Sequence, residues 1–265
     1  MHLVEETNLE PGYLRRLIGR KRWGLYYLSL RSGLLDTFGI PRSFGLDEID
    51  VRVARYLDYP RGGFFIESGA NDGVSYSNSL YFERYLGWNG LLIEPIPALV
   101  AACRRNRPKA IVEHAALVPF NHPDTVDMRF CGLMSVVRNG MRSSAEEDEH
   151  IRIGSEIQNV APYDVTVPAK PLQSILDAHD IRECDLLVLD VEGYEAQVLS
   201  GVDFDRFSPR AMLIEARYRD AVEKVLAGRY RIVEQFTDKD YLFQPTPLLS
   251  AAHPGAPTAR RATTA

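Results

Sequence analysis

Two acidic residues and two glycines stand where consecutive apolar runs of the chain end. Residues 64–66 lead into Glu67, Gly69 and Gly73, and a second apolar run ends in Glu94, 21 residues after Gly73. Glycines after a buried strand let the backbone approach a ligand that side chains would otherwise block. A carboxylate at the end of the next strand can accept hydrogen bonds from both hydroxyls of an adenosine ribose. The spacing therefore predicts a nucleoside-binding site at the ends of two strands.

The residues around the glycines indicate which nucleoside is bound. A dinucleotide site prefers Gly-x-Gly-x-x-Gly, but Asn71 occupies the position of the second glycine. The acids Glu67 and Asp72 suit a ligand with an ammonium group better than a phosphate. S-adenosylmethionine carries ribose, adenine, an amino acid and a cationic sulfonium, so we predict it as the cofactor. The alternative is an ordinary strand–turn–helix with two surface acids.

A second group of acids follows two later apolar runs. Asp190 and Glu192 lie in "DVEG", and Glu215 lies in "AMLIEA". Methyl transfer requires an acceptor oxygen that is close to the methyl group and loses its proton, so a base or a metal must lie nearby. Burial and a neighbouring acid can raise the pKa of a carboxylate for this task. Alternatively, the three acids hold a magnesium ion, or Glu192 only caps the following helix.

The histidines offer one further candidate. His114 ends the third predicted strand and could act as a base near neutral pH. The alternative is a core histidine whose hydrogen bonds are satisfied. His122, His150 and His179 have no metal-ligand spacing, and we expect them at the surface.

The elements that must position these residues alternate between strand and helix. Alternation of this kind predicts a parallel sheet covered by helices, with the ligand at the carboxyl ends of the strands. The short link "TDKD" makes the last two strands an antiparallel hairpin. The expected fold is α/β, a Rossmann-like doubly wound, mostly parallel seven-stranded sheet with an antiparallel last strand. Strands are predicted at 63–68, 90–95, 110–118, 184–193, 210–216, 230–237 and 240–245, with helices at 46–57, 77–88, 98–107, 194–202 and 219–228.

Other segments lie outside this alternation. Residues 1–46 form an N-terminal helical and basic extension, residues 47–244 the catalytic domain, and residues 245–265 a disordered tail rich in Pro, Ala and Thr. Within the domain, an insert at about 120–170 contains β structure and a polar excursion at 142–156. The basic and aromatic segment 13–35 is typical of an amphipathic helix on a membrane surface or of a helix packed on the domain.

Composition limits the class of protein. A net charge of −5 gives no reason to expect binding to nucleic acid. Three widely spaced cysteines argue against a disulfide framework and favour a reducing compartment. We expect no signal peptide and no membrane span. The expected location is the cytoplasm, with the inner face of the membrane as an alternative.

Several motifs, in this order, resemble the FkbM-type methyltransferases, which are class I S-adenosylmethionine-dependent enzymes. They are "FIESGANDGVSYSNSLYFE", "LGWNGLLIEPIPAL", "PLQSIL", "LLVLDVEGYEAQVLSGVDF" and "AMLIEA", and the resemblance covers about residues 64–218. Here "ESGAN" replaces the commoner Asp-x-Gly-Ala-Asn, which keeps a carboxylate at Glu67. Together with the residue patterns above, the resemblance implies catalytic roles for Asp190, Glu192 and His114 and a magnesium site at Asp190, Glu192 and Glu215. The implied cofactor site comprises Glu67, Ser68, Gly69, Ala70, Asn71, Asp72, Gly73, Asn78, Glu94, Pro95, Ala115, Ala116 and Asp190.

The resemblance also implies the reaction. It predicts O-methylation of a sugar hydroxyl in a glycan, glycolipid or polysaccharide precursor, with a polyketide or other secondary metabolite as the alternative acceptor. A nicotinamide-dependent oxidoreductase and a noncatalytic glycan-binding protein are more remote alternatives. The insert is expected to line the acceptor side. A small-molecule or oligosaccharide acceptor is the expected partner, and a homodimer is a further hypothesis.

Overall fold

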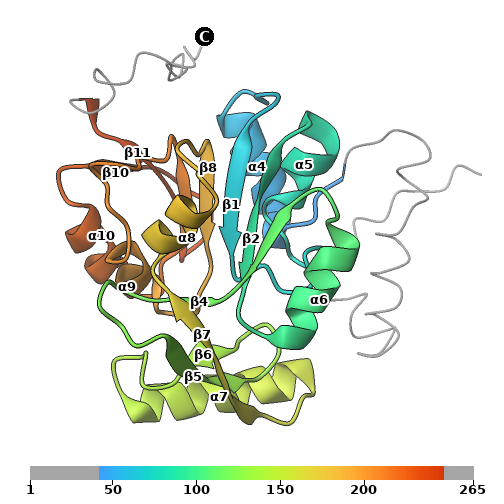
Figure 1. The fold of residues 1–265 in the computed structure, drawn as a ribbon, viewed down its shortest axis with the longest axis vertical. Coiled ribbons are helices and arrows are strands. Elements are labelled where there is room, and N and C mark those ends of the chain that lie inside the picture. The colour runs from blue at the N-terminus through green and yellow to red at the C-terminus, as the bar shows by residue number, and fades with distance from the viewer. Residues whose placement is uncertain (1–41, 248–265) are drawn as a thin grey trace, which may run out of the picture. The chain divides into compact units, whose positions relative to one another are not determined.

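The computed structural model describes residues 42–247, which form a large sheet, helices on both of its faces and a second, smaller sheet (Figure 1). The predictions for segment 13–35 and for most of the tail fall outside the described residues. Within residues 42–247, every helix is too short or too polar to cross a bilayer.

The large sheet has seven strands in the order β10-β11-β9-β8-β1-β2-β3. β11 is antiparallel to both of its neighbours, and all other pairs are parallel. The predicted fold class is therefore confirmed. The strands are β1 (Phe64–Ser68), β2 (Asn89–Glu94), β3 (Ile111–His114), β8 (Leu186–Leu189), β9 (Met212–Glu215), β10 (Tyr230–Gln235) and β11 (Asp240–Pro245).

Helices cover both faces of this sheet because its central strands are apolar on both sides. Phe65 and Ile66, adjacent in β1, are fully buried in two different core clusters. One face carries η1 (Leu46–Glu48), α4 (Ile49–Tyr56), α5 (Leu80–Leu86) and α6 (Pro97–Asn106). The other carries α8 (Leu172–Ala178), α9 (Glu195–Leu199) and α10 (Arg219–Leu226).

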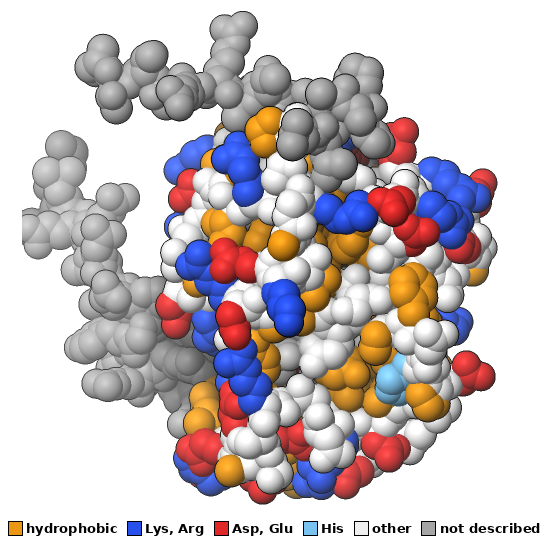
Figure 2. Space-filling model, turned by 90° about the vertical axis from the view of Figure 1, so that its left-hand side faces the viewer, with side chains coloured by type: hydrophobic (Ala, Val, Ile, Leu, Met, Phe, Trp, Pro, Cys, Tyr) orange, Lys and Arg blue, Asp and Glu red, His pale blue; other side chains and the backbone are white. Residues whose placement is uncertain are grey.

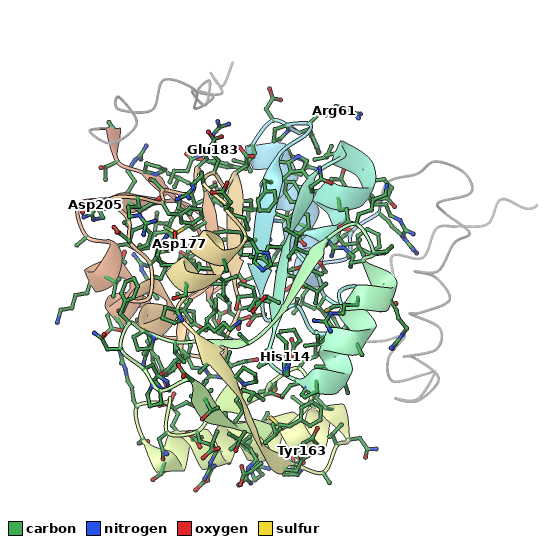
Figure 3. All side chains as sticks on the ribbon, viewed as in Figure 1. Arg61, His114, Tyr163, Asp177, Glu183 and Asp205 are labelled. Carbon is green, nitrogen blue, oxygen red and sulfur yellow. The ribbon has the colours of Figure 1, made fainter. Side chains whose placement is uncertain are left out.

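The insert begins directly after β3 and folds into its own sheet with the order β4-β7-β5-β6. It consists of β4 (Ala116–Leu117), β5 (Thr125–Phe130), β6 (Val136–Val137), α7 (Ser144–Gln158) and β7 (Tyr163–Lys170). Figure 1 shows the insert in yellow-green beyond the carboxyl ends of the parallel strands. Figure 3 places His114 at this end, whereas Arg61 and Glu183, which precede β1 and β8, lie at the opposite end.

The polar excursion predicted at 142–156 is mostly the helix α7. The Ser143 hydroxyl accepts a hydrogen bond from the Glu146 N–H at 3.2 Å and caps its first turn. One stripe of the helix is buried, and the opposite face carries exposed ion pairs of Arg152 with acids one turn away, as expected for a solvated face. The buried stripe consists of Glu147, His150, Ile151 and Gly154.

Charges of both signs are interspersed on the surface. Figure 2 shows one face of the molecule on which acidic and basic side chains alternate around apolar atoms, without a continuous basic patch. This face gives no electrostatic support for binding to nucleic acid.

Gly69 allows β1 and β8 to approach each other, and its replacement tests this contact. A Cβ at Gly69 would lie 2.0 Å from the Asp190 carbonyl oxygen, and its φ is +80°. We expect Gly69→Ala to lower the free energy of unfolding by roughly 2–5 kcal/mol, since left-handed strain and overpacking add. Gly87→Ala is the control, because φ is +71° but nothing lies within 4 Å. The free energy of unfolding of Gly87→Ala should fall by only about 1 kcal/mol. Urea denaturation measures both variants, and an equal decrease in the two would contradict the steric explanation.

Candidate active site

The carboxyl ends of β1 and β8 meet at Gly69 and Asp190. The Asp190 N–H donates to the Ser68 carbonyl at 3.3 Å, and Gly69 lies against the Asp190 carbonyl. Any larger residue at position 69 would separate the two strands. The glycine loop and the acidic turn, which are distant in the sequence, are therefore neighbours at one edge of the sheet.

Glu67 is turned into the loop that follows it. Its Oε1 accepts hydrogen bonds from the N–H groups of Asn78 (2.7 Å) and Ser79 (3.2 Å). Its Oε2 accepts from the hydroxyls of Ser77 (2.8 Å) and Ser79 (2.7 Å). The side chain is buried. In this structure the carboxylate of Glu67 holds the loop, and its contact with the cofactor stays a prediction.

Asp72 also shapes the loop. Its Oδ1 accepts from the N–H groups of Val74 (2.8 Å) and Ser75 (2.6 Å), and its Oδ2 accepts from the Ser75 hydroxyl (2.8 Å). These bonds form a side-chain-capped turn. Asp72 is partly exposed, so a ligand can still reach it.

Glu94 is buried at the end of β2 with one donor on each carboxylate oxygen. The Asn71 N–H donates to Oε2 and the Ile96 N–H to Oε1, both at 2.9 Å. Burial raises the pKa of Glu94 to about 7. The two hydrogen bonds lower this pKa, but their effect is smaller than that of burial. Each oxygen keeps a second lone pair, so the residue retains the capacity to accept ribose hydroxyls.

Exposure divides the predicted cofactor residues into two groups. Ala115 has no exposed surface and Ala116 is buried in the core of the insert, so neither is accessible in this structure, and their place beside the adenine stays a prediction. Asn78 places its Oδ1 against Gly45, in the segment before α4. The accessible residues are Gly69, Asn71, Asp72, Asn78, Pro95 and Asp190, and the buried ones are Glu67, Ser68, Ala70, Gly73, Glu94, Ala115 and Ala116.

His114 is partly buried beside Glu94, its register partner in the sheet. Its Nε2 lies 2.9 Å from the Pro95 carbonyl oxygen, to which it donates. This nitrogen therefore carries a proton and holds the end of β2. This contact agrees with the alternative prediction for His114, a histidine whose hydrogen bond is satisfied, better than with its prediction as a base.

Asp190 differs from the other acids at this edge. Burial, together with Glu215 and Glu192, raises its pKa well above the ordinary value. Among the described residues, none donates a hydrogen bond or forms an ion pair with its carboxylate. The other rim acids all have such partners.

Glu192 follows in a left-handed conformation, with φ at +54°. Burial and Glu215 raise its pKa to about 8, whereas Arg217 lowers it. Helix α9 begins at Glu195 with Tyr194 as its N-cap residue, and no side chain caps its first turn, so the alternative capping role for Glu192 is not seen. The Glu195 Oε1 accepts from the Gly193 N–H at 2.8 Å and holds the turn before the helix.

His150 is buried against this turn, which overturns its prediction as a surface residue. Its Nε2 donates to the Met134 carbonyl at 3.0 Å and lies 3.5 Å from Glu192 Oε2. Its Nδ1 accepts from the Arg217 guanidinium at 2.6 Å. Burial and Arg217 lower the pKa of His150, which keeps the ring neutral. The insert is thereby anchored to the acidic turn.

The predicted magnesium site is not formed. Glu215 Oε1 pairs with Lys239 Nζ at 3.0 Å, and Glu192 Oε2 lies 3.8 Å from the Arg217 guanidinium. Two of the three acids thus face cations, which compete with a metal for their oxygens. Across residues 42–247, no group of three His, Cys, Asp or Glu side chains is arranged to hold a metal ion.

A groove with a volume of about 590 Å³ lies where the insert meets α9 and α10. Residues 139–142 of the insert line one side, and Gln197, Ser200, Tyr218 and Lys224 contribute polar groups to the other. A Cβ on Gly140 would lie 3.0 Å from the Tyr194 ring, so this part of the insert touches the turn after Asp190. Tyr163, by contrast, packs against Phe130 at the outer end of the insert, with ring centroids 4.9 Å apart and the rings tilted by 34° (Figure 3).

Comparison with known families decides the class of the protein. The model of the FkbM methyltransferase domain matches residues 67–242, which is most of the chain. The chain belongs to the FkbM methyltransferase family. The predicted family is thus confirmed, and with it the coarse function of an S-adenosylmethionine-dependent methyltransferase. No curated protein matches the chain significantly.

Solved structures of methyltransferases are similar at low identity. The FkbM methyltransferase of Methylobacillus flagellatus KT is 14% identical, with 69% of this chain and 43% of that chain covered and a TM-score of 0.41. A TehB-like methyltransferase from Corynebacterium glutamicum is 12% identical over 86% and 100% of the chains, with a TM-score of 0.38. An amino pentose methyltransferase from Micromonospora echinaspora is 9% identical over 76% and 89%, with a TM-score of 0.39.

The raised pKa of Glu94 predicts how stability depends on pH. The protonated form is favoured in the folded protein, so the contribution of Glu94 to stability falls as pH rises from 4.5 to about 7. Glu94→Gln cannot ionise. The stability of this variant relative to wild type should therefore increase between pH 5 and pH 8, by up to about 3 kcal/mol. Urea denaturation without cofactor at both pH values measures this difference. A constant difference would show that Glu94 ionises normally.

Proposed function

We propose that this protein transfers a methyl group from S-adenosylmethionine to a hydroxyl of a sugar in a glycan, glycolipid or polysaccharide precursor. The observation that carries this proposal is Asp190, an acid of raised pKa next to the glycine loop, whose carboxylate has no hydrogen-bond or ion-pair partner among the described residues. An alcohol must lose its proton when its oxygen is methylated, and a carboxylate whose pKa is raised by burial and neighbouring acids is a stronger base than an ordinary one.

The residues at this edge fit the cofactor. Glu94 has free lone pairs for the ribose hydroxyls, while Gly69, Asn71 and Pro95 are accessible beside it. The crowded acids of the β8 turn, Asp190 and Glu192, favour a cation such as a sulfonium or ammonium group. When bound, S-adenosylmethionine supplies an electrophilic methyl group.

Asp190 then acts on the acceptor. Its carboxylate would take the proton of the acceptor hydroxyl, so that the acceptor oxygen could receive the methyl group while the bond from methyl carbon to sulfur breaks and S-adenosylhomocysteine is released. Burial and the neighbouring acids Glu215 and Glu192 keep the pKa of Asp190 high. Contacts with His150 and Arg217 hold Glu192 in place beside it. The backbone contact with Gly69 fixes the distance between this base and the cofactor loop.

The groove beside the turn supports a polar acceptor. Amide and hydroxyl groups of Asn139, Gln197 and Ser200, with the ring of Tyr218, are the groups that commonly bind sugars by hydrogen bonds and stacking. The insert lines this groove, in agreement with a role in acceptor choice. The proposed acceptor is a small molecule or an oligosaccharide. A polyketide or other secondary metabolite is the alternative acceptor.

Replacement of Asp190 tests the base. We expect Asp190→Asn to lower kcat by about 10²–10⁴-fold, which is the usual contribution of a general base. Affinity for S-adenosylhomocysteine should change little, and stability should not fall, because no partner of the carboxylate is lost. Transfer of labelled methyl groups to a panel of sugars measures activity, and calorimetry measures affinity. Asp205→Asn, an exposed acid far from this edge (Figure 3), is the control. Full activity of Asp190→Asn would reject its role.

The pairing of the rim acids with cations predicts the effect of chelation. Because Glu192 and Glu215 face Arg217 and Lys239, we expect the rate of methyl transfer to be the same with and without EDTA. The same labelled-transfer assay measures it. Loss of activity in EDTA that added magnesium restores would show that the acids rearrange around a metal.

A further inference from the structure

The last turn of α6 holds the glycine loop, and we propose that Arg107 in this turn is a positioning residue for cofactor binding. The proposal rests on the assignment of this loop to S-adenosylmethionine. It adds residues that support the loop and act on cofactor binding only through it. The residue is fully buried.

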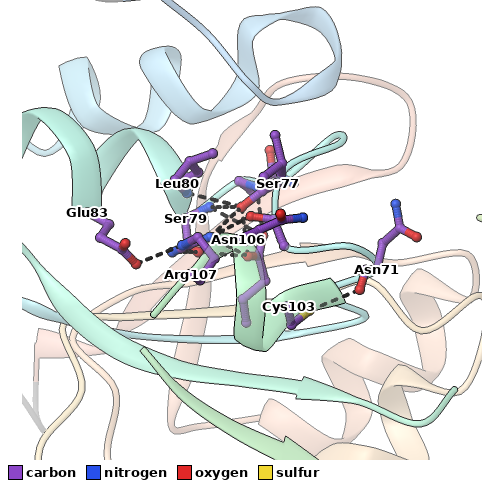
Figure 4. A network of polar contacts seen from close by, with 12 residues as sticks. Asn71, Ser77, Ser79, Leu80, Glu83, Cys103, Asn106 and Arg107 are labelled. Carbon is purple, nitrogen blue, oxygen red and sulfur yellow. Dashed lines mark hydrogen bonds and ion pairs between the residues drawn. The ribbon is translucent and has the colours of Figure 1, made fainter. Parts of the chain in front are cut away.

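Three consecutive carbonyls of the loop accept hydrogen bonds from this one turn (Figure 4). One of the three donors is the Cys103 thiol, because burial and nearby acids raise the pKa of Cys103 to about 12 and keep its proton in place. The pairs are Cys103 Sγ with Asn71 O (3.0 Å), Asn106 Nδ2 with Asp72 O (2.8 Å) and Arg107 Nη1 with Gly73 O (3.0 Å).

Arg107 connects this turn to the acids around the loop. Its Nε donates to Glu83 Oε2 at 2.7 Å, and its Nη1 lies 4.0 Å from Glu67 Oε2. The Ser77 and Ser79 hydroxyls, which donate to Glu67, accept from the same guanidinium at 3.3 and 3.2 Å. One planar cation with five donors thus bridges β1, α5 and the loop, which lysine cannot do.

The loop needs such support because its backbone is strained. Gly69, Asn71, Gly73 and Tyr76 all have positive φ values, and two of them are not glycine. Left-handed backbone costs about 1–2 kcal/mol for an ordinary residue and persists only where the surroundings impose it. Without the contacts of α6, a smaller fraction of molecules would have the loop in its binding conformation.

The same helix also fixes the ribose acid. α6 begins at Pro97, and Glu94 accepts from the N–H groups of both Ile96 and Asn71. One end of α6 therefore follows Glu94, and the other end holds the loop. The arrangement also accounts for glutamate at position 67, because its longer side chain reaches Ser77, Ser79 and the vicinity of Arg107.

Calorimetric titration of the full-length chain with S-adenosylhomocysteine tests the proposal. We expect Arg107→Lys to raise the Kd about tenfold, which corresponds to a tenfold drop in the fraction of molecules with a competent loop. Asn106→Ala, an exposed change that leaves Arg107 buried, should raise it about threefold. Arg104→Met, on the exposed side of the same helix, is the matched control and should leave the Kd unchanged.

A purely structural role for Arg107 predicts a different result. Leu226→Ala in α10 destabilises the core far from the loop, so it serves as a variant with lowered stability and intact α6 contacts. Weaker binding in Arg107→Lys and Asn106→Ala, with unchanged binding in Leu226→Ala, supports positioning. Unchanged affinity in folded Asn106→Ala and Arg107→Lys overturns it. If the wild type does not bind S-adenosylhomocysteine, the assignment of the cofactor is rejected, and the proposed role of Arg107 is rejected together with it.

Discussion

The close approach of Gly69 to the Asp190 backbone is the constraint on which the rest of the site depends. β1 pairs with β2 on one side and β8 on the other. The helices that follow β1 and β2 cover one face of the sheet, and those that follow β8 and β9 cover the other. The chain thus reverses its winding between β1 and β8, where loops diverge and a crevice forms. Because position 69 has no room for a side chain, the glycine loop and the turn after β8, which are the proposed sites of the cofactor and the base, share one fixed boundary.

This boundary also explains the electrostatics. Asp190, Glu192 and Glu195 follow one strand, Glu215 ends the next, and burial raises the pKa of the first three. Such crowding is unfavourable in the free protein and is only partly relieved by Arg217 and Lys239. A cationic ligand would complete the relief, because it lowers the pKa values of the acids around it. If the cofactor binds at the proposed site, its binding is expected to be accompanied by release of protons from these acids.

Sequence patterns identified the sheet and its rim because those depend on local signals. Apolar runs ending in an acid predicted β1, β2 and β8, and the carboxyl ends of parallel strands necessarily meet at one edge. The direction in which an acid points was not predictable: Glu67 turns inward because Arg107, 40 residues later, lies behind it. His150 was misplaced for the same reason. Its stripe on α7 contains one aliphatic residue, Ile151, and its main partner Arg217 is 67 residues away. Long-range pairs of polar groups leave no local pattern.

The way in which the insert is attached has a further consequence. It leaves the large sheet through β4 and returns through β7, and these two strands pair side by side, Ala116 with Ala169 and Leu117 with Lys170. A segment whose ends are held together can change length at a small entropic cost, since the cost of closing a loop grows only slowly with its length. The insert is thus a replaceable module on a constant catalytic frame. In evolution or engineering, residues 118–168 can therefore change while β1, β2 and β8 keep the glycine loop and the turn at Asp190 in register, and under the proposed function such changes would alter acceptor preference.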